Sequence, residues 1–204
     1  MNENTLFERL YRWRPKNEDP DNITGHRISG EEMPRRPRIL IAGGAYHVYN
    51  RGVEKRIIFN NDWDRRFFLR QLSDCARWFQ TKVIAYCLMD NHFHFYLQTL
   101  LPNLDAFMQR FGSQYVRYFN KRHDRVGGLF QGRYKDKLVE SPTYAATLLE
   151  YIHDENPRKA GHDPENYSWS SYPIYLGKAP KPDWLDTECA AMLVGQVRSQ
   201  APKF

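Results

Sequence analysis

The chain has 204 residues, of which 41% are hydrophobic and 15% aromatic, and it carries a formal net charge of +6. This composition favours one folded domain with short tails, and the chain lacks both a signal-peptide pattern and the roughly 20-residue apolar run of a membrane span, so we expect a cytoplasmic protein. The 3 cysteines are far apart and form no CxxC pair, which argues against a zinc ribbon or a disulfide framework.

The first half of the chain contains the pattern of three strands and one helix. Residues 1–36 are polar, and we interpret them as an N-terminal extension to a domain that spans residues 37–176. In this domain AYHVYN (45–50) alternates as a strand, residues 62–80 have helical spacing, and VIAYCLM (83–89) and HFHFYLQ (92–98) are predicted to form a hairpin that turns at Asp90-Asn91.

The second half of the domain is predicted to contain two helices separated by a strand. Residues 103–122 have the clearest apolar stripe, RYKDKLVE (133–140) alternates as a strand, and a further helix begins where Ser141 suits the N-cap and Pro142 the first helical position. The order β-α-β-β-α-β-α predicts an α+β fold, with a ferredoxin-like antiparallel sheet and helices on one side. Residues 177–204 are expected to form a tail with a short helix at Thr187–Arg198.

Two histidines alternate with phenylalanines in the run HFHF. In a strand, His92 and His94 share one face, while Phe93 and Phe95 share the other. Two neutral imidazoles at this spacing are placed to share a divalent cation, although histidines hydrogen-bonded at a sheet surface would give the same pattern. The pair alone therefore leaves both interpretations open.

The helix after Ser141 contributes a tyrosine and a carboxylate that could complete such a site. In TYAATLLEYIHDENP, Tyr151 and Glu155 lie one turn apart at the edge of the apolar arc that should face the sheet. If this arc covers the histidine face, one helix delivers a phenol and a carboxylate to the same cation. The alternative is that Tyr151 is a core-edge aromatic and Glu155 a solvated charge.

Basic and aromatic side chains indicate contacts with nucleic acid. Arg110, Arg117 and Lys121 form a ridge on one helix, and KRHDRVGGLFQGRYKDK (121–137) combines cations, glycines and aromatic rings, which suits phosphates and unpaired bases but also an ordinary solvated turn. The candidate DNA-binding residues are Arg51, Arg110, Arg117, Lys121, Arg125, Phe130, Arg133, Tyr134, Lys135 and Lys137.

These motifs occur together in a known family. The runs PRRPRILIAGGAYHVYNRG, LMDNHFHFYLQT, YVRYFNKRHDRVGGLFQGRYK, LLEYIHDENPRKAG and YSWSSY resemble the REP-associated tyrosine transposases, which are insertion-sequence transposase-like enzymes of the single-tyrosine HUH class. The resemblance implies an HUH nuclease fold, with His92 and His94 as metal ligands and Tyr151 as the catalytic nucleophile.

One departure concerns the third metal ligand. Relatives usually have Asn or Gln four residues after the tyrosine, whereas YIHDENP contains one extra residue, so Glu155 occupies that place and Asn156 follows. α-Helical geometry favours Glu155, because Asn156 lies about 140° round the helix from Tyr151 and precedes Pro157. We therefore expect Glu155 as the ligand, with Asn156 as the alternative.

The resemblance implies a transposase that cleaves and rejoins single-stranded DNA beside a hairpin. Tyr151 would form a 5′-phosphotyrosine link with the help of Mg²⁺ or Mn²⁺. The expected partner is single-stranded or hairpin DNA and not a membrane, so the protein would be nucleoid-associated. It would act as a monomer, or as a homodimer with a composite site. A non-catalytic nucleic-acid-binding protein and a hydrolase that activates a bound water are the alternatives.

Overall fold

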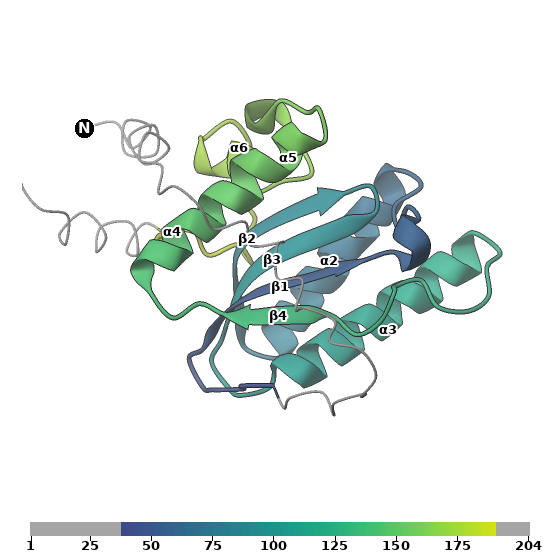
Figure 1. The fold of residues 1–204 in the computed structure, drawn as a ribbon, viewed down its shortest axis with the longest axis horizontal. Coiled ribbons are helices and arrows are strands. Elements are labelled where there is room, and N and C mark those ends of the chain that lie inside the picture. Colours follow the sequence, from purple (N-terminus) through teal and green to yellow (C-terminus); the bar gives the residue numbers. More distant parts are fainter. Residues whose placement is uncertain (1–37, 191–204) are drawn as a thin grey trace, which may run out of the picture.

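A computed structural model describes residues 38–190, which form a four-stranded antiparallel sheet covered by helices (Figure 1). The strands are β1 (Ala45–Arg51), β2 (Thr81–Met89), β3 (His92–Thr99) and β4 (Lys135–Leu138), in the order β2-β3-β1-β4. Asp90 and Asn91 form the turn between β2 and β3, as the sequence predicts. The α+β class and the ferredoxin-like strand order are confirmed.

The two long helices, α2 (Asp62–Trp78) and α3 (Leu104–Arg122), pack against one face of the sheet. The Phe68 ring of α2 packs edge-on against Phe93 of β3, and the Phe111 ring of α3 does the same against Phe95. All four rings are buried, so the phenylalanines of HFHF belong to the main hydrophobic core. A short 3₁₀ helix, η1 (Val53–Lys55), follows β1.

A third helical segment lies over the opposite face of the sheet, where the histidines are (Figure 1). It consists of α4 (Pro142–Glu150), a π-helical turn η2 (Tyr151–Glu155) and α5 (Asn156–Lys159). The Ser141 hydroxyl accepts a hydrogen bond from the Tyr144 amide, which confirms the predicted N-cap. The helices that cover one side of the sheet are thus α2 and α3, while α4 and its continuation cover the other.

The chain after α5 runs along β2 and covers this edge of the sheet. Here η3 (Pro164–Asn166) and α6 (Tyr172–Tyr175) are followed by an extended segment in which Leu185 bridges to Val83 and Asp186 pairs with Lys82. Leu185 is buried, so the compact unit continues past residue 176. Residues 187–190 are helical, but the rest of the expected helix and the N-terminal extension 1–36 lie outside the described residues. No helix within residues 38–190 is long and apolar enough to cross a membrane.

Candidate active site

The pairing of β1 with β3 brings five aromatic side chains, those of His47, Tyr49, His92, His94 and Tyr96, to one face of the sheet. His94 lies opposite Tyr49, and His47 lies diagonally beside them because it pairs with Tyr96. The rings of His47 and His94 stack at 5.2 Å between centroids, and Tyr49 stacks on both of them at 4.9 and 5.5 Å. The predicted alternation of HFHF is confirmed, because the imidazoles and the phenylalanines occupy opposite faces.

His94 is buried at the centre of this face. Its Nδ1 atom lies 2.9 Å from Nε2 of His47, while its Nε2 atom is buried without a hydrogen-bond partner. Burial lowers the pKa of His94 well below its usual value, and the positive charges of neighbouring groups, Lys159 and Arg51 among them, act in the same direction. Burial also lowers the pKa of His47 to about 3. Both imidazoles are therefore neutral near pH 7, the form that binds metals.

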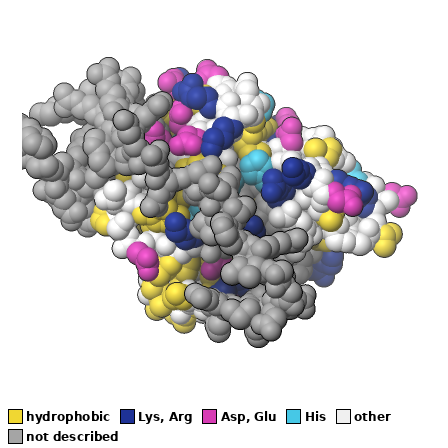
Figure 2. Space-filling view, in the orientation of Figure 1, with side chains coloured by type: hydrophobic (Ala, Val, Ile, Leu, Met, Phe, Trp, Pro, Cys, Tyr) yellow, Lys and Arg dark blue, Asp and Glu magenta, His cyan; other side chains and the backbone are white. Residues whose placement is uncertain are grey.

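His92 lies nearer the surface, at the end of β3. Its ring is edge-on to that of His94 at 5.2 Å between centroids, and its Nδ1 atom lies 2.6 Å from the Asn91 side-chain oxygen. Arg51, which is exposed, occupies the opposite position on β1. Figure 2 shows histidine side-chain atoms at the surface, next to Lys and Arg side chains.

The structure brings Tyr151 to the two histidines of the sheet centre. Its ring is edge-on to His94 at 5.3 Å and to His47 at 6.0 Å between centroids. The Lys159 ammonium lies 5.2 Å from the centre of the Tyr151 ring. Tyr151 is only 1% exposed, so its phenol ring is buried between the helical segment and the sheet. The helix therefore covers the histidine face, which is the arrangement required for a shared site.

The π-helical turn changes the expected position of the third ligand. The Asn156 amide donates to the Tyr151 carbonyl, five residues back, so the extra residue widens the turn. Asn156 is 5% exposed, and its side-chain NH₂ donates to the same carbonyl at 3.1 Å. The Glu155 side chain is 47% exposed and pairs with Lys159 at 3.1 Å. The segment is therefore not the regular α-helix that the preference for Glu155 assumed. Asn156 is the buried residue of the two, and its backbone angles are helical although Pro157 follows it.

The residues at this face fit a divalent cation only if an amide oxygen takes part. Within residues 38–190, no group of three or more His, Cys, Asp or Glu side chains is arranged to hold a metal ion. The buried Nε2 atom of His94 nevertheless has no partner, and a neutral imidazole nitrogen in this state suits a metal ligand. His92 and the Asn156 side-chain oxygen are the other candidate donors. Oxygen donors suit Mg²⁺ and Mn²⁺, and imidazole donors also suit Zn²⁺.

The predicted DNA-binding residues divide between two faces of the sheet. Near the histidine face, the Lys135 ammonium lies 5.7 Å from the Tyr49 ring centre, and that of Lys137 lies 4.3 Å from the Tyr144 ring centre. Together with Arg51, these side chains place positive charge around the histidines. They could hold a phosphate backbone near Tyr151.

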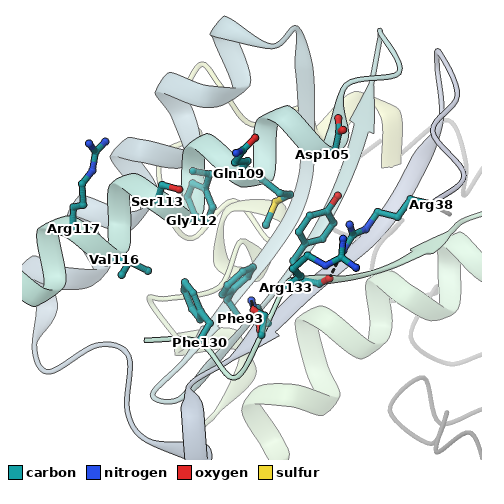
Figure 3. A pocket seen from close by; sticks show the side chains of 15 residues that line it. Arg38, Phe93, Asp105, Gln109, Gly112, Ser113, Val116, Arg117, Phe130 and Arg133 are labelled. Atoms are coloured by element: carbon teal, nitrogen blue, oxygen red, sulfur yellow. Dashed lines mark hydrogen bonds between the residues drawn. The ribbon is translucent and has the colours of Figure 1, made fainter. Parts of the chain in front are cut away.

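On the other face, four of the predicted residues line one cavity of about 680 Å³ between α3 and the segment before β4 (Figure 3). They are Arg117, Phe130, Arg133 and Tyr134. Arg38 also lines this cavity, where its guanidinium pairs with Asp136 at 2.6 Å and lies over the Tyr134 ring at 4.0 Å. Aromatic rings beside exposed arginines suit an unpaired base and its phosphate.

The remaining predicted residues lie apart from both groups. The Arg110 guanidinium packs over Trp78 at 4.9 Å from the ring centre. Lys121 is exposed in the last turn of α3, and the Arg125 guanidinium lies 5.7 Å from the Phe119 ring centre. The ridge predicted on α3 therefore does not form one continuous surface with the tyrosine site.

Sequence reasoning missed His47, Tyr49 and Lys159. His47 and Tyr49 are two residues apart in β1, the same spacing as His92 and His94, so strand alternation could have placed all four on one face. Lys159 follows Glu155 by four residues, a spacing that predicts their ion pair but not the proximity of the ammonium to Tyr151.

Comparisons with known proteins identify similar chains. A family model described as "Transposase IS200 like" matches residues 41–155. The structure of a REP-associated tyrosine transposase bound to a REP hairpin has a similar fold, at 15% identity and a TM-score of 0.59, over 76% of this chain and 94% of that chain. A putative transposase from Deinococcus radiodurans R1 aligns at 18% identity and a TM-score of 0.41, over 60% of this chain and 97% of that chain. No curated protein matches significantly.

Proposed function

The chain belongs to the family of IS200-like transposases, and we propose that it cleaves and rejoins single-stranded DNA beside a hairpin through a covalent link to Tyr151. The family assignment confirms the resemblance inferred from the sequence motifs, since the matched residues span more than half of the chain. A DNA-processing role follows from the family. The nucleophile, the metal and the form of the substrate are our proposal.

The packing of the Tyr151 ring against His94 is the observation on which the proposed chemistry rests. In the reaction, the Tyr151 oxygen attacks a backbone phosphorus and loses its proton. The bond from phosphorus to the 3′ oxygen breaks, and this oxygen leaves as a hydroxyl. The 5′ phosphate then remains on the tyrosine until a 3′ hydroxyl of another strand reverses the step.

A phenol needs help to attack near neutral pH, because its unperturbed pKa is roughly 10. A Mg²⁺ or Mn²⁺ ion held by His92, His94 and the Asn156 oxygen would polarise the phosphate and offset developing negative charge. The Lys159 ammonium lies 5.2 Å from the Tyr151 ring centre, so it brings positive charge close to the proposed nucleophile. Arg51 on β1 and Lys135 on β4 would orient the backbone beside the histidines of β3.

Access to Tyr151 requires a change in the free protein, because the side chain is 1% exposed. The π-helical turn that begins at Tyr151 is the element whose opening or rotation would expose the phenol. π-Helical turns within α-helices occur frequently at functional sites. One chain places Tyr151 against its own His94, so a composite site between subunits is not needed to bring them together.

The substrate is proposed to be a DNA hairpin with a single-stranded flank. The solved REP-associated transposase is bound to a REP hairpin, which supports this choice. The two basic surfaces described above lie on opposite faces of the sheet. A folded hairpin at the cavity of Arg117 and Phe130, with its flank passing around the sheet to Tyr151, would use both surfaces.

Formation of a covalent adduct tests the proposal. Wild-type protein, a labelled hairpin oligonucleotide with a single-stranded flank and Mn²⁺ should give a denaturant-resistant protein–DNA adduct. Tyr151→Phe should give none, whereas Tyr144→Phe, which removes a hydroxyl from α4 seven residues earlier, should behave like the wild type. Cleavage without an adduct would instead support the water-activating hydrolase, and binding without cleavage would support the non-catalytic alternative.

A further inference from the structure

His47 has no part in the proposed reaction, yet it forms the closest polar contact of His94. Its side chain is 1% exposed, and its Nε2 atom lies 2.9 Å from Nδ1 of His94. We propose that His47 is a positioning residue that sets the tautomer of His94, so that Nε2 of His94 keeps an unprotonated lone pair for the divalent cation. This inference rests on the proposed function, since it assumes that His94 binds the cation.

The contact between two imidazoles allows only one proton between them. A neutral imidazole has one N–H donor and one bare acceptor nitrogen, so either His94 Nδ1 donates to His47 Nε2, or the reverse. If His47 donates, His94 must hold its own proton on Nε2. That nitrogen is buried without a partner, so the second arrangement leaves a buried donor unsatisfied and cannot bind a metal.

The first arrangement resolves both problems. Nδ1 of His94 donates to Nε2 of His47, and Nε2 of His94 keeps the lone pair with which it would bind the cation. Metal-binding histidines usually donate their second N–H to a fixed acceptor in this way, which raises the basicity of the ligand. Carboxylates and backbone carbonyls are the common acceptors, and a second buried imidazole takes that place here.

The surroundings of His47 hold this contact in place. The Tyr49 ring stacks on both imidazoles, with interplanar angles of 27° to His47 and 21° to His94. The imidazoles are themselves within 22° of parallel, and the Tyr151 ring packs edge-on against both. Because rings confined on two sides cannot turn freely, Nε2 of His47 and Nδ1 of His94 remain within hydrogen-bond distance of each other.

Mn²⁺ affinity, measured by isothermal titration calorimetry without DNA, tests the proposal. His47→Leu removes the acceptor and should raise the dissociation constant for Mn²⁺ by about 10–100-fold, the usual effect of losing such a partner. His47→Gln keeps an acceptor oxygen and should stay within about threefold of the wild type. His162→Gln, which changes an exposed histidine on another segment, should have no effect. Rescue by glutamine distinguishes positioning from simple packing.

His92→Ala separates this inference from the proposed function. If His92→Ala weakens Mn²⁺ binding and His47→Leu does not, the positioning role is overturned and the metal site stands. If His92→Ala leaves the affinity unchanged, the metal site is wrong and the role of His47 falls with it. Should His47→Leu fail to fold, long-range ¹H–¹⁵N spectra of histidine-labelled wild-type protein give the tautomer directly. A proton on Nδ1 of His94 is expected, and a proton on Nε2 would overturn the proposal.

Discussion

The π-helical turn predicts that Asn156, rather than Glu155, contributes to cation binding. The test compares Asn156→Ala with Glu155→Ala, and adds Asn156→Asp as a variant that keeps an oxygen at the buried position. We expect Asn156→Ala to weaken Mn²⁺ binding, Asn156→Asp to restore it, and Glu155→Ala to leave it close to the wild-type value. The prediction opposes the one that an uninterrupted α-helix would give.

The expected magnitudes follow from the surroundings of the two side chains. Glu155 and Lys159 form a half-exposed pair four residues apart, and such pairs contribute about 0.3–0.5 kcal/mol, so Glu155→Ala should change the free energy of unfolding little. Asn156 is buried and donates at 3.1 Å, and one such hydrogen bond contributes about 0.5–1.5 kcal/mol. Since even partners of metal ligands account for about 10–100-fold in affinity, Asn156→Ala should raise the Mn²⁺ dissociation constant at least about tenfold.

Two measurements separate the effects on folding and on the site. Urea unfolding gives the change in stability, and calorimetric titration with Mn²⁺ gives the affinity under conditions where each variant is folded. Adduct formation with hairpin DNA then shows whether affinity and reaction change together. If Glu155→Ala lost Mn²⁺ binding while Asn156→Ala kept it, the assignment based on burial and the widened turn would be refuted.

Two further predictions concern the cavity lined by Phe130 and the buried histidines. Phe130→Ala should weaken hairpin binding by about 1–3 kcal/mol, measured by fluorescence anisotropy in EDTA, with Mn²⁺ affinity unchanged because the cavity lies on the other face. Burial lowers the pKa values of His47 and His153 to about 3, so below about pH 6.5 the unfolded chain binds more protons than the folded one. The free energy of unfolding should therefore contain the full contribution of these histidines above this pH. It should fall by up to about 1.4 kcal/mol per pH unit for each histidine as the pH decreases towards 3. A smaller slope for His153→Gln in urea unfolding would support this, and a flat profile for the wild type would contradict it.

The local elements could be predicted because their signals lie within a few residues of one another. The alternation of HFHF determines which face each ring takes, and the apolar stripe of residues 104–122 determines which side of α3 is buried. Ser141 and Pro142 mark the start of α4 through capping and a preset backbone angle. Each of these effects depends on neighbours in sequence, so no knowledge of the fold is needed.

The site depended on contacts between distant segments. His47 and His94 are 47 residues apart, and only the pairing of β1 with β3 makes them hydrogen-bond partners. The run from 121 to 137 looks like one basic surface in the sequence, but its residues line a cavity on one face and flank the histidines on the other. Successive side chains of a strand point to opposite faces, so Tyr134 lines the cavity while Lys135, its neighbour in sequence, lies beside Tyr49 on the histidine face.

The sequence by itself determined the strand and helix pattern and the family motifs, and the resemblance carried by these motifs predicts His92, His94 and Tyr151 as site residues. Only the tertiary structure decided how the extra residue after Tyr151 is accommodated. Helical periodicity assumes a constant number of residues per turn, whereas this segment lies against β2 and adopts a π-helical turn, with Asn156 buried and Glu155 at the surface. Packing against another segment stabilises the π-helical turn, and residue spacing along the sequence does not describe such packing.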